Sequence, residues 1–225
     1  MRRVRRELPE LDEAGQLEIV VADDGSSDAT ADQARASGAD RVVVNEQNRG
    51  KGAAVKAGVL AATGRTIAFT DVDLAYPPSQ ISRLLARVEA GSPMVVGSRW
   101  SEESTSAPAA PIRKLNSRLF NLATRLTVGV WRDTQCGLKA FDSSVVQDLF
   151  GRVRQDGFAF DVELFLAAES LGIEIGVVPV RLEGSDETTV RLRGQISAVL
   201  DLLRIRARLR HGGYSAPKGT ATAPS

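Results

Sequence analysis

Short apolar runs alternate along the chain with longer segments whose apolar positions recur every three or four residues. The short runs predict buried strands at residues 17–22, 41–45, 66–70, 94–98 and 173–180, with a further short strand within 133–141. The longer segments predict helices at residues 2–11, 27–37, 51–62, 77–89, 113–128, 160–171 and 194–210. Strands alternating with helices of about ten to fifteen residues are typical of parallel βαβ units. The pattern therefore predicts an α/β protein with a mostly parallel sheet.

Polar side chains gather where the predicted strands end. They are Asp23, Asp24, Asn45, Asp71, Asp73, Ser98 and Arg99. The carboxyl ends of parallel strands share one edge of the sheet, and ligands of open α/β sheets bind beyond that edge. We therefore expect these side chains to converge on one ligand site.

Two neighbouring segments indicate the kind of ligand. The basic, glycine-rich stretch Asn48-Arg49-Gly50-Lys51-Gly52 opens a predicted helix, and helix starts with nearby cations favour phosphates. Asp71 and Asp73 follow the next strand, and two such close carboxylates repel each other unless a cation lies between them. Together they predict a site for a nucleotide diphosphate and Mg²⁺ or Mn²⁺, with Asp71 and Asp73 as metal ligands. The alternatives are that Asp71 caps the next helix and that Lys51 is merely solvated.

Composition narrows the class of protein. A chain of 225 residues with 43% hydrophobic and 25% charged residues suits one soluble domain with a full core. The net charge of +1 gives no field that would attract nucleic acid, so no nucleic-acid partner is expected. The single Cys136 excludes an intrachain disulfide and fits a cytoplasmic location. We expect one domain over residues 1–211 and a disordered tail rich in Ala, Pro, Thr and Ser over 212–225.

Six motifs, in order, carry a family resemblance. Asp23-Asp-Gly-Ser-Ser-Asp-Ala-Thr30, the segment from Asn48 to Gly52, and Asp71-Val-Asp73 resemble the inverting family-two glycosyltransferases with the GT-A fold. The remaining three resemble the polyprenyl-phosphate (dolichyl-phosphate) branch: Gly97-Ser-Arg99, Asp133-Thr-Gln-Cys-Gly137 and Phe160-Asp-Val-Glu163. The resemblance spans about residues 17–189. It implies a three-layer GT-A sandwich that transfers glucose from UDP-glucose to a polyprenyl phosphate with inversion.

The resemblance also implies roles on the donor side. Asp23 and Asp24 are expected to contact uracil and ribose through their acceptor oxygens, and Lys51 to meet the base or a phosphate. Asp73, helped by Asp71, is expected to hold the divalent cation that neutralises the leaving diphosphate, which makes Asp73 a catalytic residue. Asp28 and Thr30 are expected to form a turn and a helix cap.

On the acceptor side, a phosphate is already anionic and needs no general base, unlike an alcohol. The acceptor phosphate is expected at four residues, of which the first two also count as catalytic: Arg99, Arg113, Ser117 and Arg118. Arginine forks grip phosphate oxygens in pairs, and residues four apart share a helix face; a solvated basic face is the alternative. Asp161 and Glu163 are expected to orient sugar hydroxyls, and helix capping is the alternative for Asp161.

Three departures from the family pattern keep other interpretations open. Relatives begin with an apolar strand near the middle of the sheet, whereas this chain starts within the predicted helix at 2–11, so we expect a truncated start and reduced stability. Many relatives carry C-terminal membrane spans, and no apolar run here approaches the required length of about 20 residues. Mannosyl relatives have Gln at the place of Ala75. A GDP-mannose-dependent enzyme and a non-catalytic, truncated nucleotide-binding or partner protein are the alternatives.

The predicted helix at 194–210 is basic and amphipathic. Four apolar residues are expected on one face: Ile196, Val199, Leu200 and Leu203. Such a helix can lie on an anionic bilayer, which would place the protein peripherally on the inner face of the plasma membrane. An ordinary solvated surface is the alternative.

Overall fold

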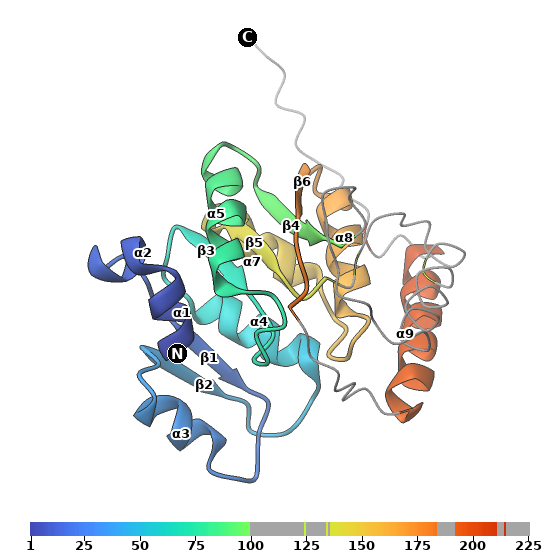
Figure 1. The fold of residues 1–225 in the computed structure, drawn as a ribbon. Helices are drawn as coiled ribbons and strands as arrows, with labels where there is room; N and C mark the ends of the chain where they lie inside the picture. The colour runs from blue at the N-terminus through green and yellow to red at the C-terminus, as the bar shows by residue number, and fades with distance from the viewer. Residues whose placement is uncertain (100–123, 125–133, 135, 184–191, 211–213, 215–225) are drawn as a thin grey trace.

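A computed structural model of the chain describes residues 1–99, 124, 134, 136–183, 192–210 and 214. Figure 1 shows the elements in space. In chain order they are α1 (Arg2–Glu7), α2 (Pro9–Glu13), β1 (Val20–Asp23), α3 (Thr30–Ala36), β2 (Arg41–Val44), α4 (Lys51–Ala61), β3 (Thr66–Phe69), η1 (Pro78–Gln80), α5 (Ile81–Glu89), β4 (Met94–Ser98), β5 (Lys139–Asp142), α7 (Ser143–Arg152), α8 (Phe160–Ser170), β6 (Ile175–Pro179) and α9 (Leu192–Arg210). The predicted alternation of strands and helices is confirmed over the described residues.

The described strands form two sheets. β1 and β2 pair in parallel, with Val20 opposite Arg41. The larger sheet has the order β3-β5-β4-β6, in which β4 and β6 are parallel and β5 is antiparallel to both of its neighbours. Among these strands no hydrogen-bonded ladder joins β1 to β3, although α4 packs on both. In the larger sheet every strand except β5 therefore runs in the same direction, and β1 and β2 are parallel to each other, as predicted. The absent family strand stays a prediction.

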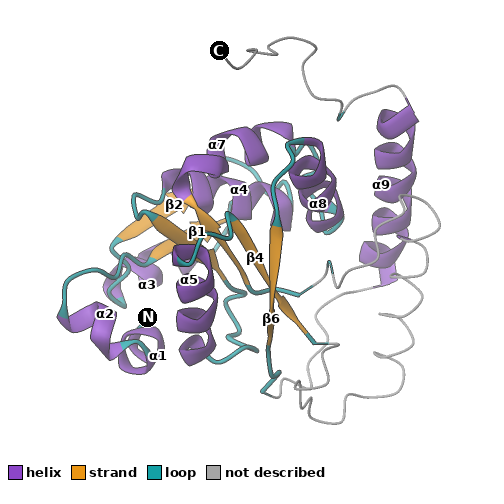
Figure 2. Cartoon of the chain, turned by 90° about the horizontal axis from the view of Figure 1, so that it is seen from above, coloured by secondary structure: helices purple, strands orange, loops and turns teal. Residues whose placement is uncertain are grey.

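Helices cover the larger sheet on both faces (Figure 2). Met94 and Val96 of β4 belong to the core shared with α4, α7 and α8, whereas Val95 belongs to the core shared with α5. Alternate residues of a strand point to opposite faces, and all three of these side chains are at most 2% exposed. The strand is thus buried on both sides, as in the predicted three-layer sandwich.

Two helix predictions need correction. The helix expected at 2–11 is broken at Leu8, because Pro9 has no N–H to continue the ladder and disfavours helical backbone in the residue before it. Helix α7 was not predicted, although Asp142 caps it and Val146, Leu149 and Phe150 are buried. The helix predicted at 113–128 lies outside the described residues, apart from Thr124.

The C-terminal helix α9 forms as predicted, but with another face inward. Leu202 and Ile205 are buried against α8, whereas Leu200 and Leu203 are about half exposed. Tyr214, which the sequence assigns to the tail, is also buried, so the packed part of the chain extends to this residue at least. None of the helices described combines the length and apolar character that crossing a membrane needs.

Candidate active site

Asp24 shapes the loop between β2 and α4. Its Oδ1 accepts hydrogen bonds from Asn45 Nδ2 (2.9 Å) and the Arg49 amide (3.1 Å), and its Oδ2 accepts one from the Gly50 amide (2.5 Å). Both carboxylate oxygens are therefore engaged by the protein. The predicted contact of Asp24 with a nucleotide stays a prediction, and its visible role is to hold the glycine-rich loop against β1.

The glycines of this loop allow it to pack closely on the turn before α8. Gly50 has φ +119°, and a Cβ atom there would lie 2.5 Å from the carbonyl oxygen of Asp156. At Gly52 a Cβ atom would lie 2.6 Å from the carbonyl oxygen of Gln155. The Ala53 amide donates to the Asp156 carbonyl at 3.2 Å. Close packing between two chain segments thus explains both glycines, and phosphate binding by the loop stays a prediction.

The other carboxylates after β1 organise their own turn. Asp23 is buried, and its Oδ1 accepts from the Ser26 amide (3.0 Å) and hydroxyl (2.6 Å). Asp28 accepts from the Thr30 hydroxyl and amide, which lowers the pKa of Asp28. The predicted turn at Asp28 is present, but the predicted cap is not, because the N-cap of α3 is Ala29 and no side chain caps the helix. The nucleotide contact of Asp23 stays a prediction.

Lys51, Asp71 and Asp73 lie together beyond the carboxyl end of β3. Lys51 Nζ is 2.6 Å from Asp71 Oδ1, so the lysine at the start of α4 is paired rather than merely solvated. The loop is a tight turn in which the Leu74 amide donates to the Asp71 carbonyl (3.0 Å) and the Ala75 amide to Asp73 Oδ1 (3.1 Å). Leu74 has φ +48°, an unfavourable value for a side chain branched at Cγ, so the turn stores strain.

Charge holds this group together. Burial alone would lower the pKa of Lys51, but attraction to Asp161, Asp71 and Asp73 outweighs it and raises that pKa. Lys51 therefore carries its positive charge at neutral pH. Asp73 is exposed to solvent. One carboxylate is thus neutralised by the protein and the other faces outward.

The donor set fits a divalent cation that arrives with a diphosphate. Within the described residues no group of three or more His, Cys, Asp or Glu side chains is placed to hold a metal ion. Mg²⁺ is commonly bound by one or two carboxylates together with substrate phosphates and water. Asp73 and Asp71 are the two carboxylates at this position, and their role as metal ligands stays a prediction.

A buried lysine that was not predicted from the sequence lies next to this group. Lys139 of β5 is fully buried, and its Nζ donates to Asp161 Oδ1 (2.7 Å) and to the carbonyls of Cys136 (2.6 Å) and Thr134 (3.2 Å). Burial raises the pKa of Asp161, and the positive charges of Lys139 and Lys51 oppose that rise. A lysine inside the apolar run 136–141 was the signal for this ion pair. Asp161 lies in the first turn of α8 but does not cap it.

Glu163 joins α8 to α9. Its Oε2 accepts from the amides of Arg154 and Gln155, both at 2.6 Å, and its Oε1 accepts from Arg208 Nη1 (2.8 Å) and the Tyr214 hydroxyl. Burial and the neighbouring Glu163 raise the pKa of Tyr214. Through these contacts the Glu163 carboxylate links α8 to the segment before it, to α9 and to Tyr214. Its contact with the sugar stays a prediction.

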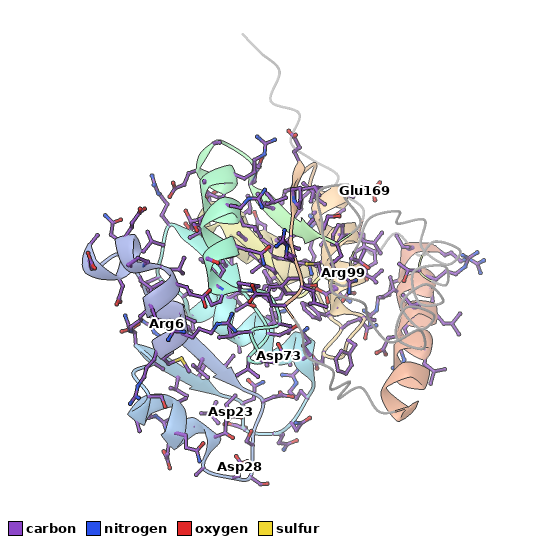
Figure 3. The ribbon with its side chains drawn as sticks, viewed as in Figure 1. Arg6, Asp23, Asp28, Asp73, Arg99 and Glu169 are labelled. Carbon is purple, nitrogen blue, oxygen red and sulfur yellow. The ribbon has the colours of Figure 1, made fainter. Side chains whose placement is uncertain are left out.

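Of the predicted acceptor residues, Arg99 lies within the described part of the chain. Arg99 directly follows β4 and is half-buried. Figure 3 labels it together with Asp23, the last residue of β1, and Asp73, which lies in the loop after β3. The other three lie outside the described residues: Arg113, Ser117 and Arg118. Their convergence on a phosphate stays a prediction.

With the fold and the strand-end residues described, comparison with known proteins identifies the family. Residues 3–150 match the family described as Glycosyl transferase family 2, so the chain belongs to that family. It is 32% identical over 206 residues to a dolichyl-phosphate beta-glucosyltransferase of Trichomonas vaginalis, with 87% of this chain and 61% of that protein covered. It is 35% identical over 188 residues to the Drosophila melanogaster dolichyl-phosphate beta-glucosyltransferase, with 76% and 58% covered. The chain thus spans about three fifths of the length of these relatives.

Solved structures confirm the fold. The chain superposes on glucosyl-3-phosphoglycerate synthase of Mycobacterium tuberculosis in complex with UDP with a TM-score of 0.67 at 23% identity, covering 96% of this chain and 76% of that one. The same enzyme with Mn²⁺, UDP-glucose and glycerol 3-phosphate gives 0.65 at 22% identity, with the same coverage. The predicted GT-A fold is therefore confirmed. That the neighbour binds Mn²⁺ together with UDP-glucose is a property of that enzyme.

Proposed function

We propose that the chain is a divalent-metal-dependent glycosyltransferase that transfers glucose from UDP-glucose to a polyprenyl phosphate, with inversion at the anomeric carbon. The observation that carries this proposal is the arrangement of Lys51, Asp71 and Asp73 beyond β3, next to a loop fastened by Asp24. The names of the relatives supply the sugar and the class of acceptor. GDP-mannose as donor and a non-catalytic role are the alternatives.

In this proposal the residues beyond β3 bind the leaving group. Asp73 presents an exposed carboxylate for Mg²⁺ or Mn²⁺, and a bound cation neutralises the charge that develops on the diphosphate. Lys51 holds Asp71 at 2.6 Å and adds a positive charge beside the diphosphate. A buried Asp161, fixed by Lys139, accepts hydrogen bonds from sugar hydroxyls.

The acceptor supplies its own nucleophile. A phosphate oxygen attacks the anomeric carbon from the side opposite UDP, so that the new C–O bond forms while the bond to UDP breaks, and the configuration inverts. Because the phosphate is already ionised, no side chain needs to remove a proton. Arg99, with Arg113, Ser117 and Arg118, orients the phosphate in this proposal through charge-assisted hydrogen bonds.

The experiment is a donor screen. Purified protein is incubated with MnCl₂ or MgCl₂, a polyprenyl phosphate and each of UDP-glucose, UDP-galactose and GDP-mannose, and lipid products are analysed by mass spectrometry. Glucosyl phosphate lipid from UDP-glucose alone is the expected result. Formation of a mannosyl lipid from GDP-mannose would instead support the alternative donor. If UDP binds but no donor gives a product, the non-catalytic alternative is favoured.

Mutation of the arginines tests the acceptor assignment. Arg99→Ala and Arg113→Ala should each raise the acceptor KM or lower kcat by about tenfold or more, because a charge-assisted hydrogen bond contributes about 1.5–3 kcal/mol. Calorimetry should show UDP affinity within about twofold of wild type, since neither residue is assigned to the donor. An equal loss of UDP affinity would move them to the donor side.

A lipid acceptor also requires contact with a membrane surface. On α9, Leu200 and Leu203 are 50% and 51% exposed, and the exposed Arg204 and Arg210 fall on the same helical face. We expect the protein to sediment with vesicles that contain anionic lipid and not with neutral ones. Leu203→Ser should weaken that binding, and equal sedimentation with both lipid compositions would reject an electrostatic, peripheral contact on the cytoplasmic face.

A further inference from the structure

The turn that leads into β5 passes directly against the carboxylate of Asp71. A Cβ atom on Gly137 would lie 2.1 Å from Asp71 Oδ2 and 3.0 Å from its Cγ. Non-bonded heavy atoms pack best about 3.5–4.0 Å apart, so any side chain at residue 137 requires Asp71 or the turn to move. Gly137 has no φ in the left-handed region. The contact with Asp71, rather than backbone conformation, is therefore what distinguishes glycine from other residues here.

Asp71 is held from two sides. Its Oδ1 is 2.6 Å from Lys51 Nζ, and its Oδ2 faces Gly137. A displacement of the carboxylate away from residue 137 would therefore also disturb its ion pair with Lys51. The two contacts together fix where this carboxylate lies beyond β3.

The turn itself is firmly anchored. Lys139 Nζ donates to the carbonyl oxygens of Thr134 and Cys136 and to Asp161, all in a fully buried position. Cys136 is buried as well, and its Sγ lies only 2.8 Å from where a Cβ atom of Gly97 would be. The interior is close-packed and transmits strain. A side chain added at residue 137 would thus displace Asp71 rather than the turn.

We propose that Gly137 is a positioning residue for Asp71, because its missing side chain lets the anchored turn form a wall against the carboxylate. The inference rests on the proposed function, in which Asp71 helps Asp73 to hold the cation and the diphosphate. A misplacement of about 1 Å in such a site can reduce turnover about 100-fold. Gly137 therefore sets the affinity for the metal-bound nucleotide without touching it.

Gly137→Ala tests this with a matched control. At Gly151 in α7 an added Cβ meets no atom within 4 Å, so Gly151→Ala makes the same chemical change in open space. We expect Gly137→Ala to weaken UDP binding in the presence of Mn²⁺ about tenfold, as measured by calorimetry, and Gly151→Ala to leave it unchanged. UDP binding measured in EDTA should differ little between the two variants, since the effect passes through a metal-binding carboxylate.

A double-mutant cycle shows whether the effect passes through Asp71. Removal of the carboxylate in Asp71→Ala also removes the atom that an alanine at residue 137 would strike. Adding Gly137→Ala to that background should then change UDP·Mn²⁺ affinity by less than about twofold, because contacting residues are not additive. If Gly137→Ala lowers the melting temperature, Asp71→Ala should relieve that loss.

Three outcomes decide the matter. Wild-type affinity in Gly137→Ala, an equal loss in both backgrounds, or a loss of melting temperature that Asp71→Ala does not relieve would each overturn the positioning role. If the wild-type protein itself shows no Mn²⁺-dependent UDP binding, the proposed function is rejected and the inference with it. That result is distinct from failure of the inference alone, in which the wild type binds and the variant matches it.

Discussion

Two aspartates lie at the end of β1 and two lie in the loop after β3, yet the structure uses the two pairs differently. At the end of β1, both carboxylate oxygens of Asp24 accept hydrogen bonds from three donors of the neighbouring loop, and the buried Asp23 accepts hydrogen bonds from Ser26. After β3, Asp71 is paired with Lys51, and the carboxylate of Asp73 faces solvent from a strained turn. The same residue type at corresponding strand ends is thus engaged by the protein in one loop, whereas in the other one carboxylate is left exposed.

The contrast shows that a carboxylate at a strand end is informative only with its partners. A carboxylate whose oxygens accept several amide hydrogen bonds is satisfied and stabilises its loop. One that is exposed beside another carboxylate remains available to a cation. On this reasoning, changes at Asp24 should affect mainly stability, whereas changes at Asp73 should affect mainly chemistry.

The largest effect is expected at Asp73. Asp73→Asn removes a metal-binding charge, so turnover should fall about 100-fold or more, given that each 1.36 kcal/mol of lost stabilisation is about tenfold. The melting temperature should stay at the wild-type value, because within the described residues the Asp73 side chain is exposed and accepts one local hydrogen bond, from the Ala75 amide. Asp32→Asn, which neutralises an exposed carboxylate on α3, is the control and should retain wild-type turnover. Near-normal transfer by Asp73→Asn in EDTA-treated buffer would contradict the metal assignment.

Asp24 should show the opposite balance. Asp24→Ala leaves the donors of Asn45, Arg49 and Gly50 without their acceptor, and an unmade hydrogen bond in a partly buried place costs about 1–3 kcal/mol. We expect the free energy of unfolding in urea to fall by about 2 kcal/mol, whereas Asp32→Ala should stay close to wild type. Unchanged stability in Asp24→Ala would break the comparison between the two loops.

The smallest effect concerns Asp142, the carboxylate that ends β5. It caps α7 by accepting from the Ser144 amide (2.8 Å) and hydroxyl, and these bonds lower the pKa of Asp142. Asp142→Ala should cost about 1 kcal/mol of unfolding free energy at neutral pH. Because the pKa of Asp142 is lower in the folded state, its charge stabilises the folded protein at pH values above the unfolded pKa of about 3.9. That stabilisation is lost as the pH falls through the pKa of the folded state.

Urea unfolding at neutral pH and at about pH 2 measures the difference in unfolding free energy between the wild type and Asp142→Ala. That difference should be smaller at the lower pH. Asp148→Ala on the same helix is the control, since Asp148 is exposed and should show no such difference. If Asp142→Ala lowers the unfolding free energy equally at both pH values, the charge of Asp142 does not contribute to the cap.

The strands and the strand-end site were predictable because they depend on local pattern. Apolar runs ending in Asp fixed the positions of β1 and β3, and the spacing of Asp71 and Asp73 placed both on one turn. The direction of β5 was not predictable, since nothing in a strand of only four residues indicates which way it runs in the sheet. Helix α7 was missed despite a capping Asp142 and apolar residues at helical spacing.

Partners far apart in sequence escaped prediction for a different reason. Glu163 accepts from Arg208 and Tyr214, 45 and 51 residues further along the chain, and no local pattern specifies such a pairing. Lys139 is buried because Asp161 and two carbonyls surround its charge, which only the folded chain brings together. Sequence therefore located the polar residues at the strand ends, but it did not indicate the distant partners that hold the site in place.

The most direct test of the central claim is the dependence of UDP binding on a divalent cation. Calorimetric titration of UDP into the wild-type protein, with Mn²⁺ and with EDTA, should give affinity at least about tenfold higher with the cation, a difference of about 1.4 kcal/mol. In Asp73→Asn that difference should disappear, while the affinity in EDTA stays at the wild-type value. UDP binding that is equally strong with and without Mn²⁺ in the wild type would contradict a metal–diphosphate site at the end of β3.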